Sequence, residues 1–227
     1  RGYLETYEDK DQEKIRLKDD PKGPLSIWKL PEAEHEYVIF SDTSEGLPGG
    51  DYSCADVLDK ETGEQVAQWH GLIDPDLLGS DVLPNLGWYY RQAEIGVERN
   101  NDGKTVLYAL KQVYGRIFKS VVTDERTNKT TEKLGWLTTV RSKPMMINEL
   151  RRCIRESGVI INNPETIAEC LTFVRYPNGT TAAQQNCKDD RVMSLAGALQ
   201  MLLLNPYIKP RRTKQLAKPN YDATTGY

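Results

Sequence analysis

The 227-residue chain has no apolar run as long as the roughly 18 residues that a membrane span needs. Its four cysteines form no CxxC pair and it has only two histidines, so we expect no structural zinc site. The wide cysteine spacing predicts reduced, mostly buried thiols, as in cytosolic proteins. No charged and then apolar leader follows Arg1. We therefore expect no signal peptide and a piece of a longer protein.

An excess of basic residues is also missing. Thirty Lys and Arg stand against 33 Asp and Glu, which gives a formal net charge of −3 at pH 7. Binding to nucleic acid would therefore need a local basic surface, or metal ions held by acidic side chains. With 38% hydrophobic residues, the chain has enough apolar mass for a core.

The composition predicts three regions. Residues 1–36 are expected to be a poorly packed lead-in or linker, because 8–20 are dense in charges of both signs and Pro-Lys-Gly-Pro follows at 21–24. The folded domain is expected over 37–204. Residues 205–227 contain three prolines and five basic residues against one acid, which predicts a basic, disordered tail.

The element pattern indicates an α/β fold. Strand-like runs at 37–40, 53–58 and 65–69 predict three strands, antiparallel to one another, with hairpin-turn chemistry at 59–63. Runs at 117–122 and 134–140 flank a polar segment and predict a long hairpin. Other short strands are expected at 95–97 and 159–161. Apolar periodicity predicts helices over 74–91 with a break at Pro84, over 103–113, over 144–156 with Met145, Leu150 and Ile154 inward, from 165, and over 192–204.

Acidic residues stand at the ends of three of these elements. Asp42 follows the first strand, Glu98 ends a later strand, and Asp189 and Asp190 open the last helix. If the strands are neighbours, these carboxylates meet, and closely packed like charges need a cation. Oxygen ligands without His or Cys favour Mg²⁺ or Mn²⁺, and paired ions of this kind are typical of phosphodiester hydrolysis. The alternative is that each acid caps a helix or faces solvent.

Three segments together resemble the nuclease domain of phage terminase large subunits. They are 37–53 (YVIFSDTSEGLPGGDYS), 95–103 (IGVERNNDG) and 188–199 (KDDRVMSLAGAL), and their order and approximate spacing agree with that family. The resemblance covers about residues 25–204. It implies an RNase H-like fold: a mixed sheet with three antiparallel strands and then parallel strands, helices on both faces, and a protruding β-hairpin.

The resemblance implies a divalent-metal-dependent endonuclease that cuts concatemeric double-stranded viral DNA when packaging starts and ends. Asp42 would be the central metal-bridging ligand, and Glu98 with Asp189 and Asp190 would complete the sites for Mg²⁺ or Mn²⁺. Which of the two neighbouring aspartates ligates directly stays open. Asp51 fits the second aspartate of the first motif, and an Asx-type turn is its alternative role.

Basic residues near these motifs are the candidates for DNA binding. Arg99 and Lys143 are expected beside the acidic cluster. The family's hairpin lies beside its active site, which adds Arg116, Lys119, Arg126 and Lys129, although composition alone favours a solvated, charged hairpin.

The resemblance also implies partners. In this family an ATPase domain precedes the nuclease in the full-length chain, and the portal protein and small terminase subunit act with it at the capsid portal in the host cytoplasm. This chain contains no GxxxxGK[ST] motif, so we expect no ATPase activity from it. Two alternatives stay open: another RNase H-like nuclease such as a Holliday-junction resolvase, and a non-catalytic module that docks on portal or DNA.

Overall fold

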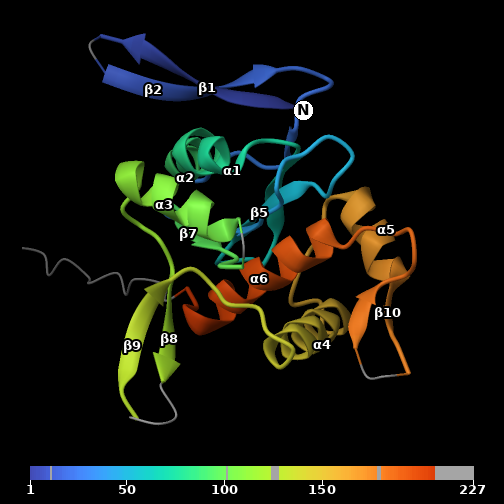
Figure 1. The fold of residues 1–227 in the computed structure, drawn as a ribbon. Helices are drawn as coiled ribbons and strands as arrows, with labels where there is room; N and C mark the ends of the chain where they lie inside the picture. The colour runs from blue at the N-terminus through green and yellow to red at the C-terminus, as the bar shows by residue number, and fades with distance from the viewer. Residues whose placement is uncertain (11, 101, 124–127, 178–179, 208–227) are drawn as a thin grey trace, which may run out of the picture.

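A computed structural model describes residues 1–10, 12–100, 102–123, 128–177 and 180–207. Across these ranges the chain forms a seven-stranded mixed sheet in the order β2-β1-β3-β6-β5-β4-β7 (Figure 1). The strands are β1 (Gly2–Asp9), β2 (Gln12–Asp19), β3 (Leu25–Ile27), β4 (Tyr37–Asp42), β5 (Ser53–Asp59), β6 (Gln65–Gly71) and β7 (Glu94–Val97).

The centre of the sheet has the predicted topology. β4, β5 and β6 are antiparallel neighbours, and β7 runs parallel to β4. The turn between β5 and β6 ends at Gly63, whose φ of +71° suits glycine, and a Cβ there would lie 2.6 Å from the Gly158 carbonyl oxygen. The predicted mixed sheet, with three antiparallel strands and then parallel pairing, is confirmed, and β7 is the strand that pairs in parallel among the named strands of the described residues.

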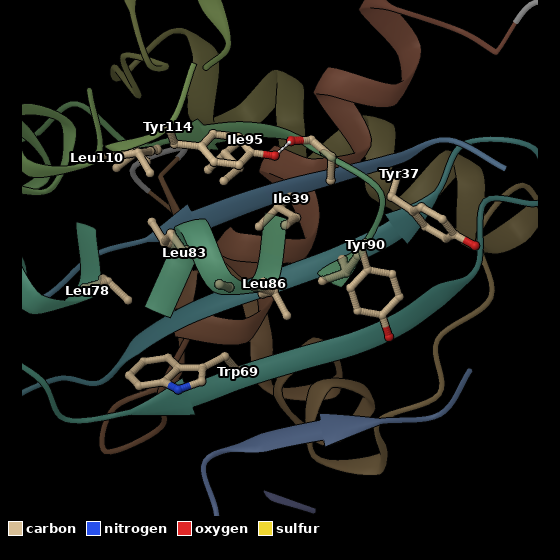
Figure 2. Close-up of a cluster of buried hydrophobic side chains, with 14 of the residues drawn as sticks. Tyr37, Ile39, Trp69, Leu78, Leu83, Leu86, Tyr90, Ile95, Leu110 and Tyr114 are labelled. Carbon is tan, nitrogen blue, oxygen red and sulfur yellow. Dashed lines mark hydrogen bonds between the residues drawn. The ribbon is translucent and has the colours of Figure 1, made fainter. Parts of the chain in front are cut away.

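Helices cover both faces of the sheet, as predicted. One face carries α1 (Pro75–Leu77), the π-helix η1 (Leu78–Val82), α2 (Leu83–Tyr89) and α3 (Gly103–Val113). The other carries α4 (Ser142–Arg155), α5 (Pro164–Thr172) and α6 (Asp190–Leu204). Side chains alternate along β4, so Ile39 packs into the first core, shown in Figure 2, while Val38 and Phe40 pack into the second, against α6.

The prediction of a poorly packed lead-in over 1–36 is wrong. β1 and β2 form a hairpin, and β3 joins it to β6. Leu25 is buried, and Leu4 and Leu17 pack against the first core. The density of charged residues suggested a linker. The charged residues alternate with Ile15 and Leu17, however, and that alternation is the pattern of a strand with one solvated face.

Two further predictions need correction. The strands of the hairpin are β8 (Lys119–Thr123) and β9 (Thr130–Leu134). The second strand was expected over 134–140 and instead ends at Leu134, and residues 137–140 are in no strand. In α4, Met145 and Ile154 are exposed, and the buried stripe is Met146, Ile147, Leu150 and Cys153.

The remaining features are elements that were not predicted, a predicted segment that lies outside the described residues, and the cysteines. A small two-stranded sheet, β10 (Phe173–Arg175) with β11 (Thr181–Ala183), was not predicted. Most of the predicted tail, residues 208–227, lies outside the described residues. The four cysteines are free thiols, with Cys54 and Cys153 buried. Among the described helices, none has the length and hydropathy of a membrane span.

A buried polar network behind β5 yields a stability prediction. The Asp56 carboxylate is fully buried and accepts hydrogen bonds from Gln65 Nε2 (2.6 Å) and Gln68 Nε2 (2.9 Å). Burial nevertheless raises the pKa of Asp56 to about 6. The folded state therefore binds a proton more tightly than the unfolded state, and the stability from this proton is lost as the pH rises through 6.

We expect Asp56→Asn to remove that loss, because an amide keeps the acceptor oxygen and carries no charge. Relative to wild type, the free energy of unfolding of Asp56→Asn should rise by roughly 2 kcal/mol between pH 4 and pH 8. Urea unfolding of both proteins at the two pH values measures this difference. If the difference in unfolding free energy between the two proteins were the same at pH 4 and pH 8, that would contradict the raised pKa of Asp56.

Candidate functional site

An open cleft of about 1300 Å³ lies at the edge of the sheet where β4 ends. Five segments distant in sequence line it among the described residues: the end of β4 with the loop 43–52, the residues after β7, residues 138–144 at the start of α4, residues 180 and 181 at the start of β11, and the start of α6. All four predicted central acids line this cleft: Asp42, Glu98, Asp189 and Asp190. The structure therefore brings together side chains that are up to 148 positions apart in the sequence.

Asp42 and Glu98 meet because β4 and β7 are parallel neighbours. The Glu98 amide donates to the Ser41 carbonyl oxygen (2.9 Å), which fixes the two strand ends side by side. The two carboxyl groups are within hydrogen-bond reach of each other. Burial, then the hydrogen bond and charge of Glu98, then the charges of Asp190 and Asp189 raise the pKa of Asp42 well above its ordinary value.

Helix α6 delivers the third acidic position. Its close approach to β4 is allowed at Gly197, where a Cβ would lie 2.2 Å from the Phe40 ring. The Ser194 hydroxyl fixes the position of α6 against β4 by donating to the Phe40 carbonyl oxygen (2.9 Å). Asp190 is therefore buried beside the strand end, and its Oδ2 has no hydrogen-bond partner among the described residues.

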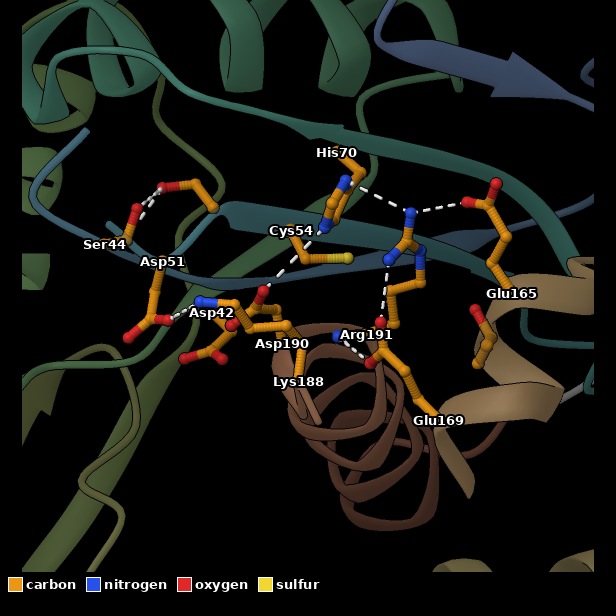
Figure 3. Close-up of polar contacts among 12 residues, drawn as sticks. Asp42, Ser44, Asp51, Cys54, His70, Glu165, Glu169, Lys188, Asp190 and Arg191 are labelled. Atoms are coloured by element: carbon orange, nitrogen blue, oxygen red, sulfur yellow. Dashed lines mark hydrogen bonds and ion pairs between the residues drawn. The ribbon is translucent and has the colours of Figure 1, made fainter. Parts of the chain in front are cut away.

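Two lysines pair with two further carboxylates of the cleft, those of Asp189 and Asp51. Lys143, from α4, lies 3.2 Å from Asp189 Oδ2. Lys188 forms an ion pair with Asp51, whose side chain is exposed on the cleft loop (Figure 3). Asp51 thus lines the cleft as predicted, and it is joined to the residue directly before the aspartate pair. A direct ligand role for Asp51 stays a prediction.

The residues present suit a divalent cation. Asp42, Glu98, Asp189 and Asp190 offer oxygen ligands only, which matches Mg²⁺ or Mn²⁺. Glu98, Asp190 and Asp189 together raise the pKa of Asp42, which indicates a surplus of negative charge in the cleft. Within the described part of the chain, no three His, Cys, Asp or Glu side chains are close enough to form a ready-made ligand set. Asp189 and Asp51 are each paired with a lysine.

The predicted basic residues divide into two groups. Lys143 lines the cleft, as expected. The described lining residues include Glu98 and Asn100 but not Arg99, whose Nη1 is buried. Arg116 lies near Glu36 at the opposite end of β4 and not among the described residues that line the cleft; its contact with DNA stays a prediction.

The hairpin residues stay solvated. Lys119 pairs with Glu132 (3.2 Å) across the hairpin, and Lys129 is exposed. Arg126 lies outside the described residues. Sequence reasoning missed Asn100, whose Nδ2 donates to Glu98 Oε1 (2.7 Å) and which orients that carboxylate. Its position two residues after the strand-end acid was the available signal.

No protein-family model matches the chain, but solved structures do. The large terminase nuclease from thermophilic phage G20c with bound magnesium matches with a TM-score of 0.62 and 20% identity, over 80% of this chain and 89% of that one. The Thermus phage P74-26 large terminase nuclease domain matches with a TM-score of 0.57 and 20% identity, over 83% and 92%. The chain therefore has the RNase H-like fold of phage large terminase nuclease domains.

Proposed function

We propose that the chain is the nuclease domain of a viral DNA-packaging terminase, a divalent-metal-dependent endonuclease that cuts concatemeric double-stranded DNA when packaging starts and ends. One observation carries the proposal: Asp42, Glu98, Asp189 and Asp190 line a single cleft. The fold supports it, because a solved terminase nuclease with the same fold holds magnesium.

The four acids would hold the cations. Divalent ions bound there supply charge stabilisation on the phosphodiester and lower the pKa of water, as in two-metal hydrolysis. Asp42 would be the ligand shared between two ions, a role supported by the effect of Glu98, Asp190 and Asp189 on its pKa. Asn100 orients Glu98 through its 2.7 Å hydrogen bond.

Lys143, the basic residue among the described residues that line the cleft, suits the DNA backbone. Lys143 already pairs with one carboxylate in the cleft, so its ammonium group is placed to bind a phosphate oxygen when Asp189 has another partner. Contacts to phosphate carry no base information, which gives cutting with little sequence preference. The proposal includes the ATPase domain of a full-length chain, the portal protein and the small subunit as partners at the capsid portal in the host cytoplasm.

The test is nicking and linearisation of supercoiled plasmid with Mg²⁺, Mn²⁺, Ca²⁺ or EDTA. We expect cleavage with Mg²⁺ or Mn²⁺ and none with EDTA. Cleavage that persists in EDTA would contradict a metal-dependent site. A strong preference for a four-way junction over linear DNA would favour a resolvase, and no cleavage together with no metal binding would favour a docking module.

A further inference from the structure

His70, on β6, lies in the same row of the sheet as Asp42. The register pairs Asp42 with Cys54 and Cys54 with His70 across β4, β5 and β6. Directly opposite residues of an antiparallel pair point to the same face. His70 therefore stands on the face that α6 covers, beside the start of that helix (Figure 3).

The His70 ring is held on two sides. Tyr52 stacks on it with ring centroids 4.8 Å apart and an interplanar angle of 19°. Arg191 Nη2 lies 3.2 Å from His70 Nδ1. Arg191 is itself fixed, because Nη1 donates to Glu169 Oε1 (2.7 Å) and Nη2 donates to Glu165 Oε2 (2.5 Å).

This contact decides where the imidazole proton sits. A guanidinium group only donates hydrogen bonds and does not lose its charge in proteins. His70 Nδ1 must therefore accept the bond from Arg191, and a neutral ring then carries its hydrogen on Nε2.

The Nε2–H group faces the aspartate of the cleft. His70 Nε2 is 3.9 Å from Asp190 Oδ2. Both atoms are buried, and neither has a hydrogen-bond partner among the described residues. Burying a donor and an acceptor without partners is costly, and each atom is the group that would satisfy the other after a small side-chain rotation.

We propose that His70 is a positioning residue for Asp190: Glu165 and Glu169 orient Arg191, Arg191 fixes the His70 tautomer, and His70 Nε2–H holds Asp190 Oδ2 so that Oδ1 faces the cleft. This inference rests on the proposed function, in which Asp190 is a metal ligand. Outer partners of this kind fix the orientation of ligating carboxylates and typically contribute 10- to 100-fold to metal affinity.

The test is calorimetric titration of Mn²⁺ into wild type, His70→Phe, His70→Gln and His35→Phe. Phenylalanine keeps a ring against Tyr52 and removes both nitrogens, whereas glutamine keeps one acceptor and one donor. His35 is the matched control, because it is similarly buried and its Nδ1 bonds Asp59 (2.6 Å) at the other end of β5.

We expect about 10- to 100-fold weaker Mn²⁺ binding by His70→Phe, and near wild-type binding by His70→Gln and His35→Phe. At the Mn²⁺ concentration that half-saturates wild type, the kcat of plasmid cleavage should be lower for His70→Phe than for wild type. The KM for DNA should be the same in both proteins. Wild-type affinity in His70→Phe would overturn the positioning role alone. So would equal losses in His70→Phe and His70→Gln. No binding by wild type would overturn the proposed function, and this role with it.

A second measurement does not depend on any variant folding. Nitrogen-15 NMR of the imidazole rings in wild type reports which nitrogen carries the hydrogen. We expect His70 to be protonated on Nε2 only. A hydrogen on Nδ1 alone would overturn the inference, because the Arg191 contact excludes that tautomer.

Discussion

Asp42→Asn is expected to lower metal-dependent plasmid cleavage about 1000-fold or more, a loss of roughly 4 kcal/mol in transition-state stabilisation. Asp42 interacts with each of the other three acids, since Glu98, Asp190 and Asp189 all raise its pKa. Asparagine keeps the size of the side chain and removes the charge that a bridging ligand needs. The variant should fold at least as well as wild type, because one of several repelling carboxylates is gone.

The matched control is Asp76→Asn, an exposed aspartate in α1 outside the described lining of the cleft. It loses the same charge from the whole domain and should cleave like wild type. The comparison separates a ligand role from a general effect of net charge on DNA binding. Equal cleavage by wild type and Asp42→Asn would show that the acids of this cleft are structural.

Gly103→Ala is expected to damage both the fold and the site. A Cβ at this position would lie 1.6 Å from the Glu98 carbonyl oxygen and 3.3 Å from Thr43 Oγ1. The clash is with backbone, so either α3 or the end of β7 must move. We expect the free energy of unfolding to fall by about 3 kcal/mol. Cleavage should fall about 100-fold, because displacing Glu98 by an ångström misplaces a ligand.

Gly115→Ala is the control for that substitution. Gly115 is exposed just after α3, and a Cβ there would have no heavy atom within 4 Å. Its unfolding free energy should change by less than about 1 kcal/mol and its cleavage should match wild type. Urea unfolding and plasmid cleavage on both variants measure the two effects. Wild-type stability and cleavage in Gly103→Ala would contradict the placement of Glu98 against α3.

Local patterns in the sequence were enough to predict the centre of the fold. The apolar run that becomes β4, the turn ending at Gly63 and the acids opening α6 each depend on neighbouring residues only. β6 runs parallel to β4, and the helices between β6 and β7 return the chain so that β7 also pairs in parallel with β4, which brings Asp42 beside Glu98. Element ends marked the four acids as candidates, and the resemblance to terminase nuclease domains joined them into one site.

Features that depend on register or on distant pairs were not predictable in the same way. Arg116 is close to the hairpin in sequence, yet it lies beside Ile95 of β7, near Glu36 at the other end of β4 from the cleft. The Lys188–Asp51 pair joins residues 137 positions apart. The alternation of Ile15 and Leu17 with charged residues indicated a strand, but the high density of charged residues over 8–20 favoured a linker in the prediction.

The central claim is that the four acids of the cleft hold divalent cations. Calorimetric titration of Mn²⁺ into wild type and Asp42→Asn, with Mg²⁺ as competitor, tests it most directly. We predict that wild type binds Mn²⁺, that Mg²⁺ displaces it, and that Asp42→Asn binds at least about tenfold more weakly. Absence of binding by wild type, or equal affinity in the two proteins, would contradict the metal centre proposed for this cleft.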